Sequence, residues 1–308
     1  MPRSAVTGKT NNVSLGFSLM LVAFLFFASM ESSAKWLVMG TLPALQVVFM
    51  RYLGHFAATL VVYLPREGKQ MFVSNQPGIQ FLRALFLLMS TTLNFFALKY
   101  LPLTVTIAIF FAVPLIVCLM SIPVLGEKVG IHRLAAVATG FGGVLVIVQP
   151  WNISFSKPML FAITATFSAS AYFVLTRKIA GADGNSVSQV YSAGLATALL
   201  APLGILYWQS PDNTVDWILL CGLGTLGFVG HSLLTAAHRF AEASVLAPSV
   251  YSQILYATFF SWFVFHDAPA QNTILGTMII VASGIYIWHR ERRQQSSLAA
   301  EPELSQSA

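Results

Sequence analysis

Apolar residues along this chain form long continuous runs of roughly 20 residues, the length of helix that a hydrocarbon core about 30 Å thick requires. The runs are continuous rather than alternating. This indicates helices, which satisfy their own backbone hydrogen bonds inside a bilayer. Short segments with Pro, Gly and charged residues separate the runs. The pattern predicts ten transmembrane helices, at 14–39, 43–64, 79–99, 102–125, 131–150, 157–178, 187–208, 215–238, 243–265 and 271–289.

Composition supports the same class. The chain is 56% hydrophobic and 9% charged, whereas a soluble domain carries about 25% charged residues. We therefore predict an all-α integral membrane protein that has the lipid bilayer as its surroundings. Residues 1–13 form a short N-terminal tail in this prediction, and the polar segment 290–308 is predicted to be disordered.

The basic residues predict the orientation. Placing the N-terminus in the cytoplasm leaves only Lys99 and Lys157 outside, which is the positive-inside bias of membrane proteins. Both termini are then cytoplasmic, and the net charge of +6 needs no nucleic-acid partner. The basic residues on the inner side are Arg3, Lys9, Arg66, Lys69, Arg83, Lys128, Arg133, Arg177, Lys178, Arg239, Arg290, Arg292 and Arg293.

An internal repeat is visible in the loops. The segment 97-ALKYLPLTV-105 aligns with 237-AHRFAEASV-245, and the same alignment brings 125-LGEK-128 onto 265-FHDA-268, so that an acid recurs. Each half, 14–150 and 151–289, would hold five helices. An odd number of spans turns the second half upside down, the arrangement from which secondary transporters build one midplane site. Chance similarity between apolar segments is the alternative.

At these residues the chain resembles a known family. The run 114-PLIVCLMSIPVLGEKVGIHRLAAVATGFGGVLVIV-148 is similar to the Pro-Leu … Leu-Gly-Glu … Gly-Gly-Val-Leu signature of the EamA family in the drug/metabolite transporter superfamily. The second half departs from it, because His266 and Asp267 replace Gly-Glu. The resemblance implies a ten-helix carrier in a cell membrane of the bacterial inner-membrane kind, with a central cavity between the halves. It does not imply a substrate. The segments 31-ESSAK-35 and 50-MRYLGH-55 look most like a subgroup with riboflavin and S-adenosylmethionine importers.

Charged residues inside the first two helices are the strongest candidate site. At 1.5 Å per residue, Glu31 lies about 13 Å and Arg51 about 12 Å below the outer surface. Lys35 and His55 lie one turn away on the same faces, so the sequence predicts a polar column of Lys35, Glu31, Arg51 and His55 between the two helices. An ionised side chain near the bilayer centre costs at least about 2.5–3.5 kcal/mol, so these groups should face a cavity or one another.

Two interpretations of the column stay open. In one, Glu31 bonds Lys35 or Arg51 and only fastens the helices together. In the other, Arg51 binds a carboxylate or phosphate of the substrate with its guanidinium, and Glu31 or His55 exchanges a proton. Proton symport, proton antiport and substrate exchange all fit the second interpretation.

Other residues are weaker candidates for substrate contact. The polar ones are Asn94, His231 and Gln253, for which helix–helix hydrogen bonding is the alternative. The aromatic ones are Phe110, Tyr172, Tyr251 and Tyr256, on helices that the resemblance places around the cavity, with ordinary packing as the alternative. The run 222-GLGTLG-227 matches a dinucleotide motif, but it lies inside a membrane helix, where small residues serve close helix packing.

Three classes of function compete at this stage. A secondary transporter that moves a small polar or ring-bearing metabolite by alternating access fits the repeat and the charges inside the spans. A membrane enzyme would need clustered catalytic or metal-binding residues, but the six histidines are scattered. A channel-like or structural subunit would favour rings of charge. We therefore predict a transporter, with no cofactor and no metal.

Overall fold

The computed structural model describes residues 12–40, 42–101, 109–149, 156–265 and 271–305. Within these residues the chain is helical and has no strand, so the predicted all-α class is confirmed. The elements are α1 Val13–Met39, α2 Ala44–Glu67, the 3-10 helix η1 Gly68–Phe72, α3 Pro77–Tyr100, α5 Val113–Leu125, α6 Ile131–Val148, α7 Met159–Lys178, α8 Asn185–Leu206, α9 Thr214–Phe240, α10 Ala243–Leu246, the 3-10 helix η3 Ala247–Tyr251, α11 Ser252–Phe265 and α12 Gln271–Ser305.

Length and apolar composition allow five stretches of the described residues to cross a membrane. They are Val13–Met39, Ala44–Phe72, Met159–Lys178, Asn185–Leu206 and Thr214–Phe240. Shorter apolar helices occupy Val113–Leu125, Ile131–Ile147 and Gln271–Ile287. Helix positions therefore follow the apolar runs closely, because the runs themselves set how long each helix must be.

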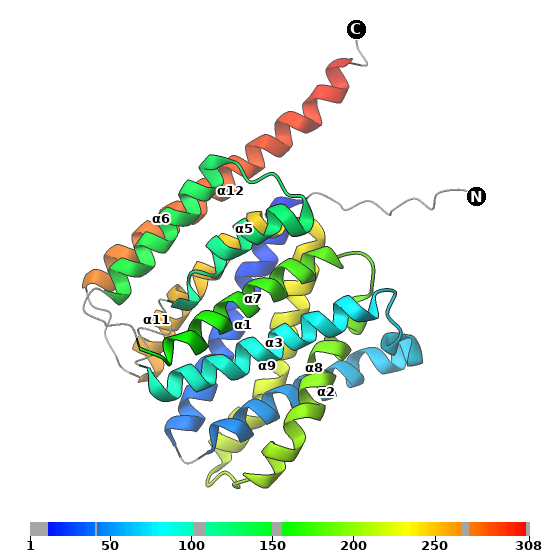
Figure 1. Cartoon of the computed structure of the whole chain (residues 1–308), viewed down its shortest axis with the longest axis vertical. Helices are drawn as coiled ribbons and strands as arrows, with labels where there is room; N and C mark the ends of the chain where they lie inside the picture. The colour runs from blue at the N-terminus through cyan, green and yellow to red at the C-terminus, as the bar shows by residue number, and fades with distance from the viewer. Residues whose placement is uncertain (1–11, 41, 102–108, 150–155, 266–270, 306–308) are drawn as a thin grey trace.

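The helices pack as a bundle with a pair at each edge. In Figure 1, α6 and α12 lie side by side at one edge, and α2 and α8 lie side by side at the opposite edge. Between them, α1 packs on α9 and α11, while α7 packs on α3 and α5. The helix α9 also packs on α2, so it separates α1 from most of α2. A side chain on α1 therefore meets α9 or α11 before it meets α2.

The two ends of the bundle are named here after the ends of α1, the Val13 end and the Met39 end. At the Val13 end, the backbone N–H of Asn12 donates to the carbonyl of Phe240. At the Met39 end, the indole of Trp36 donates to Asp216, 3.1 Å away. The helix α9 is therefore antiparallel to α1.

A group of five residues, the Glu127 cluster, joins α5 and α6 to the α9–α10 connection at the Val13 end. The Glu127 carboxylate accepts the backbone N–H groups of Ala243 (2.9 Å) and Ser244 (3.1 Å) and the Ser244 hydroxyl (2.6 Å). Arg133 forms an ion pair with Glu242 at 3.0 Å and also donates to Ser244. Both oxygens of the Glu127 carboxylate and the backbone N–H groups of Ala243 and Ser244 thus have partners within the cluster. These bonds hold the two segments together.

A second group at this end, the Asp183 cluster, joins the α7–α8 loop to the start of α3. The Asp183 carboxylate accepts the hydroxyl of Ser74 (2.5 Å), the backbone N–H of Asn75 (2.7 Å) and the amide of Gln80 (2.9 Å). Burial is the largest single effect on its pKa and would raise it. The hydrogen bonds from Ser74, Gln80 and Asn75 act the other way and together bring the pKa of Asp183 below its ordinary value.

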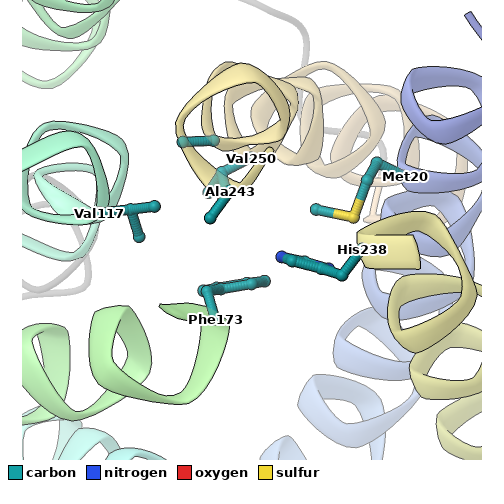
Figure 2. Close-up of a pocket in the computed structure, with 7 residues that line it drawn as sticks. Met20, Val117, Phe173, His238, Ala243 and Val250 are labelled. Carbon is teal, nitrogen blue, oxygen red and sulfur yellow. The ribbon is translucent and has the colours of Figure 1, made fainter. Parts of the chain in front are cut away.

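Apolar packing also closes the Val13 end. Side chains from six elements surround a gap that has no room for a water molecule. Figure 2 shows them turned toward one another, with the rings of Phe173 and His238 stacked at 6.0 Å. The side chains that line the gap are Met20, Val117, Phe173, His238, Ala243, Ala247 and Val250.

The structure refines one predicted helix and corrects one predicted tail. The predicted span 243–265 is helical throughout, but it changes from α10 to the 3-10 helix η3 at Ala247–Tyr251 before α11 begins. Pro248 lies in this 3-10 segment, where its missing N–H and ring are tolerated. The segment after Arg290 was predicted to be disordered, whereas α12 continues to Ser305. Its Glu, Arg, Gln, Leu and Ala residues are good helix formers, a preference that the polar composition concealed.

Three basic residues differ from their predicted role as loop charges. Arg83, Arg133 and Arg177 lie within α3, α6 and α7, and all three are buried. Arg133 bonds Glu242, and Arg177 donates to the carbonyl of His238. Their charges are therefore used inside the protein, because a buried guanidinium needs acceptors for its N–H groups.

Gly224 in 222-GLGTLG-227 and Gly230 beyond it serve helix packing, as predicted, whereas Gly222 does not. A Cβ added at Gly224 would overlap the backbone of Gly54 on α2, and one at Gly230 would overlap the ring of Phe27 on α1. Nothing lies within 4 Å of a Cβ at Gly222. Small residues at this spacing let α9 approach α2 and α1 closely, which is why α9 fits between them.

Replacing Gly224 by Ala should lower the thermal unfolding midpoint of the protein in detergent. Forcing a methyl group into this backbone contact costs about 1–3 kcal/mol. Gly222→Ala is the matched control on the same helix and should leave the midpoint unchanged or slightly raised, because Ala favours helix. Equal midpoints for the two variants would contradict the close approach of α2 and α9.

The Asp183 cluster should make stability depend on acid pH. Because the folded pKa is lowered, the stabilisation is complete above the pKa of the free carboxyl, near about 4, and disappears as pH falls through the folded value. Asp183→Asn should lower the unfolding midpoint at pH 7, since a hydrogen bond to a charged group contributes about 1.5–3 kcal/mol. The gap from wild type should shrink below about pH 4. Lys178→Ala, at an exposed position at the same end of the bundle, is the control, and a gap independent of pH would refute this role for Asp183.

Candidate functional site

A hydrogen bond joins Glu31 on α1 to Gln253 on α11, and the charge of Arg51 on α2 acts on Glu31. We call these three residues the Glu31 cluster. The amide of Gln253 donates to the Glu31 carboxylate at 2.6 Å. The side chain of Glu31 is exposed although α1 packs on α9 and α11. Glu31 thus keeps part of its surface open to the surroundings of the bundle beside its bond to Gln253.

Arg51 keeps its donors available within the Glu31 cluster. It is half-buried, and its guanidinium carbon lies 5.2 Å from the centre of the Tyr52 ring. Its charge acts on Glu31, His55 and His231. Among the described residues the ion pair found is that of Arg133 with Glu242, and Arg51 does not form one with Glu31. The planar fork of N–H groups therefore remains free to bind an oxygen-rich group.

A change of helix type lies next to this cluster. Gln253 lies in the first turn of α11, immediately after the 3-10 helix η3. The backbone stays helical across this junction, and the N–H of Ser252 donates to the carbonyls of Ser249 and Val250. The junction places the Gln253 amide beside the Glu31 carboxylate.

A second set of residues lies deeper, and we call it the Arg83 network: Arg83, Tyr172, His231, His55 and Gln189. Arg83 on α3 is fully buried. Arginine has five N–H groups, and each has an acceptor here. The acceptors are Thr176 Oγ1 (2.7 Å), the Ser188 carbonyl (3.1 Å), Ser192 Oγ (2.7 Å), the Tyr172 hydroxyl (3.1 Å) and Thr235 Oγ1 (3.2 Å).

The network continues through two histidines. The hydroxyl of Tyr172 lies 2.9 Å from Nδ1 of His231. The imidazole of His231 stacks on that of His55, with ring centres 5.4 Å apart and an interplanar angle of 13°. Nε2 of His55 lies 3.0 Å from the amide oxygen of Gln189. The chain of contacts therefore runs through α3, α7, α9, α2 and α8, and only Nε2 of His231 has no partner among the described residues of this network.

The predicted column between the first two helices is wrong in its arrangement. Glu31 bonds α11, while His55 bonds α8 and stacks on α9. The reason is the position of α9, whose glycines let it pack between α1 and α2. Lys35 is half-buried one turn from Glu31. Of the four residues, Glu31 and Arg51 thus lie in the Glu31 cluster and His55 lies in the Arg83 network, while Lys35 belongs to neither set. The charge of Arg51 acts on both sets.

The remaining candidates fall into three groups. Gln253, Tyr172 and His231 belong to the two sets above. Tyr251 is buried and donates to the carbonyl of Val137 at 3.1 Å, so its hydroxyl is used by packing. The other three candidates are half-buried and belong to neither set: Asn94, Phe110 and Tyr256.

Sequence reasoning missed Arg83 and Gln189. A signal existed for Arg83, which falls inside the predicted span 79–99, where an ionisable residue is costly. A signal also existed for Gln189, because Asn185, Ser188, Gln189 and Ser192 follow helical spacing and form a polar face on α8. Among the described residues no group of three His, Cys, Asp or Glu side chains could hold a metal ion.

Several curated proteins are similar to this chain. A riboflavin transporter of Vibrio cholerae is 30% identical over 89% of this chain and 93% of its own length. An S-adenosylmethionine uptake transporter of Rickettsia prowazekii is 25% identical over 84% of this chain and 88% of its own. A riboflavin transporter of Brucella anthropi is 25% identical over 88% and 98%. These names are of transporters and not of enzymes, as the sequence predicted.

A solved crystal structure has the same fold. It superimposes with a TM-score of 0.74 over 95% of this chain and 99% of that chain, at 19% sequence identity. The model of the EamA-like transporter family matches residues 14–149 and again residues 156–288. The matched segments contain both the Glu31 cluster and the Arg83 network. The chain is thus a multi-pass membrane protein that belongs to the EamA-like transporter family.

Proposed function

We propose that this chain carries a ring-bearing metabolite of the riboflavin class across the membrane by alternating access, and that the Glu31 cluster binds it. The observation that carries the proposal is that Arg51, whose guanidinium forms no ion pair among the described residues, lies close enough for its charge to act on the exposed residue Glu31. Ionisable groups inside a membrane protein are retained mainly where they line a solute or ion pathway. Membrane transport is the activity of the family, so a pathway is expected here.

The change of helix type beside Gln253 supports this location. Secondary transporters commonly bind their solute near the membrane midplane, beside helices of irregular hydrogen bonding. Here the 3-10 helix η3 lies between α10 and α11, and the first turn of α11 supplies Gln253 to Glu31. A carboxylate at this position is also suited to a coupling proton, so we include proton symport through Glu31 in the proposal.

The helix contacts support two inverted repeats, 14–150 and 151–289. If the first helix of each half corresponds, α1 matches α7 and α3 matches α9. The contact between α1 and α9 then corresponds to the contact between α7 and α3. The contact between α1 and α11 corresponds in the same way to the contact between α7 and α5. The edge pairs α2 with α8 and α6 with α12 each join equivalent helices. In the proposal, ten spans form two equivalent halves, and these halves can move against each other around one binding site.

The proposed state is outward-facing. The Glu127 and Asp183 clusters and the apolar packing of Figure 2 close the Val13 end. The exposed Glu31 lies beyond this closure, toward the Met39 end. Given the positive-inside bias, we assign the Val13 end and both termini to the cytoplasm of a bacterial inner membrane.

Riboflavin is the first choice of substrate because two of the relatives named above carry that name, one at 30% identity. Its chemistry fits, since the pyrimidine edge of a flavin presents two carbonyl oxygens and one N–H between them. Arg51 can donate to a carbonyl oxygen, and the free oxygens of Glu31 and Gln253 can accept the N–H. Aromatic and imidazole rings nearby suit a flat solute.

S-adenosylmethionine is the second candidate. Opposite charges on Glu31 and Arg51 would suit the ammonium and carboxylate of its amino-acid portion. The relative from Rickettsia prowazekii carries this name at 25% identity. Uptake of labelled riboflavin, with S-adenosylmethionine as competitor, separates the two solutes.

Arg51→Ala should reduce riboflavin uptake by more than about tenfold, because truncating one partner of a buried charged contact costs 2–5 kcal/mol. Arg51→Lys should keep part of the uptake, since it retains the charge and loses the fork. The measurement is uptake by a bacterial strain that cannot make or import riboflavin, normalised to membrane expression. Arg66→Ala, exposed at the Val13 end of α2, is the control. Normal uptake by Arg51→Ala would remove Arg51 from the site.

The Glu127 cluster should control access from the Val13 end, and a native cysteine can report this. Cys118 is buried, and its thiol lies 3.7 Å from the carbonyl of Ser244. In a Cys221→Ser background, Glu127→Ala should raise the rate at which a maleimide labels Cys118, because three hydrogen bonds to the cluster are lost. Lys128→Ala, at the exposed neighbouring position, should leave the rate unchanged. Equal rates for both variants would argue against this gate.

A further inference from the structure

His231 occupies a junction between four helices. It lies on α9, and its ring is 4.7 Å from that of Phe27 on α1, 5.4 Å from that of His55 on α2 and 5.9 Å from that of Tyr172 on α7. Only 4% of the residue is exposed. A buried polar ring should have a hydrogen-bond partner for each of its two nitrogens. Which nitrogen of His231 carries the proton decides whether each one needs a donor or an acceptor.

The hydrogen bonds fix which nitrogen carries the proton. Arg83 can only donate, so the Tyr172 oxygen is the acceptor of their 3.1 Å contact. The single hydroxyl proton of Tyr172 is then left for Nδ1 of His231, 2.9 Å away. Thr176 Oγ1 is also near the Tyr172 hydroxyl, but it already accepts from Arg83 at 2.7 Å and donates to the Tyr172 carbonyl. Nδ1 therefore accepts, and in the neutral ring the proton lies on Nε2.

That Nε2–H group is a buried donor with no acceptor among the described residues. A buried donor left without a partner costs about 1–3 kcal/mol, and such exceptions in native structures call for an explanation. Nδ1 of His231 and Nε2 of His55 have partners in Tyr172 and Gln189. The unused donor on Nε2 of His231 therefore marks a position in the Arg83 network at which a further group can bind.

The position of His231 connects this donor with the Glu31 cluster. Phe27 packs on His231, and it precedes Glu31 by one turn on the same face of α1. On α2, His55 follows Arg51 by one turn in the same way. The His231 ring thus lies one turn from the Glu31 cluster in the direction of the closed Val13 end. A solute leaving Arg51 toward that end would meet it next.

We propose that His231 binds the transported solute through its Nε2–H group, at a position deeper than Arg51. Its partner is a carbonyl, hydroxyl or ring-nitrogen acceptor on a flat solute, which the rings of Phe27 and His55 would flank. Tyr172 and Arg83 are positioning residues, because they hold the proton on Nε2. This inference rests on the proposed function, since it assigns a second contact to the same solute.

Two replacements of His231 separate its nitrogens. The amide of Gln reaches the place of Nε2 and keeps a donor there, whereas the shorter Asn keeps a polar atom only near Nδ1. We expect His231→Gln to bind riboflavin within about threefold of wild type and His231→Asn to bind about tenfold more weakly, the equivalent of one hydrogen bond. The measurement is quenching of riboflavin fluorescence by the purified full chain, with the unfolding midpoint of each variant recorded to confirm folding.

The positioning role of Tyr172 needs a different readout. Tyr172→Phe should weaken riboflavin binding in the wild-type background and should have no further effect in the His231→Asn background, because the donor that it holds is already gone. A Tyr172 that merely supports the fold would weaken binding equally in both backgrounds, and that result would overturn its assignment.

The outcomes distinguish this inference from the proposed function. If wild type binds riboflavin and His231→Asn binds it equally well, the inference is wrong and the proposed function stands. The same holds if His231→Gln binds as weakly as His231→Asn. If wild type binds neither riboflavin nor S-adenosylmethionine, the proposed function is wrong and this inference falls with it.

Discussion

The need to satisfy every polar group away from water governs the centre of this protein. Arg83 is the clearest case, because its guanidinium is fully buried in a chain whose surroundings are lipid. A charge in that position is tolerated only with a complete set of acceptors, and α7, α8 and α9 provide them. The side chain on α3 therefore ties together helices from both halves of the sequence. Its donors are all used, so it holds the structure around the site and has none left for a solute.

Close packing by small residues sets the distances within which these bonds can form. Gly224 and Gly230 let α9 lie against α2 and α1, and this brings His231 into contact with His55 and Phe27. A larger residue at Gly224 would separate α9 from α2 and would also move the stacked imidazoles apart. Packing and the polar network are thus parts of one arrangement, since helices in lipid associate through close contact and hydrogen bonds.

The two ends of the bundle differ in a way that gives the proposed transport cycle a physical basis. Carboxylates of Glu127 and Asp183 accept several donors each at the Val13 end, whereas Glu31 in the middle accepts one from Gln253 and stays exposed. Opening the Val13 end would require these bonds to be exchanged for bonds to water, which is available at a membrane surface. Glu31 stays open on one side, and in the proposed cycle the solute supplies its further partners.

The sequence by itself determined the class of the protein, the positions of most helices and the family resemblance, because helix length and apolar composition are local properties that the bilayer thickness selects. It also identified Glu31, Arg51, His55 and His231 as polar residues inside spans, since each violates the apolar pattern. Only the tertiary structure decided their partners. Glu31 meets Gln253 rather than Arg51, and His55 meets His231 and Gln189, because the order of helices around the bundle depends on which surfaces pack most closely. The tertiary structure also decided the 3-10 segment Ala247–Tyr251 and the burial of Arg83. Periodicity tells where a helix runs and which face is polar, but contacts between helices far apart in the chain depend on shapes that no single segment contains.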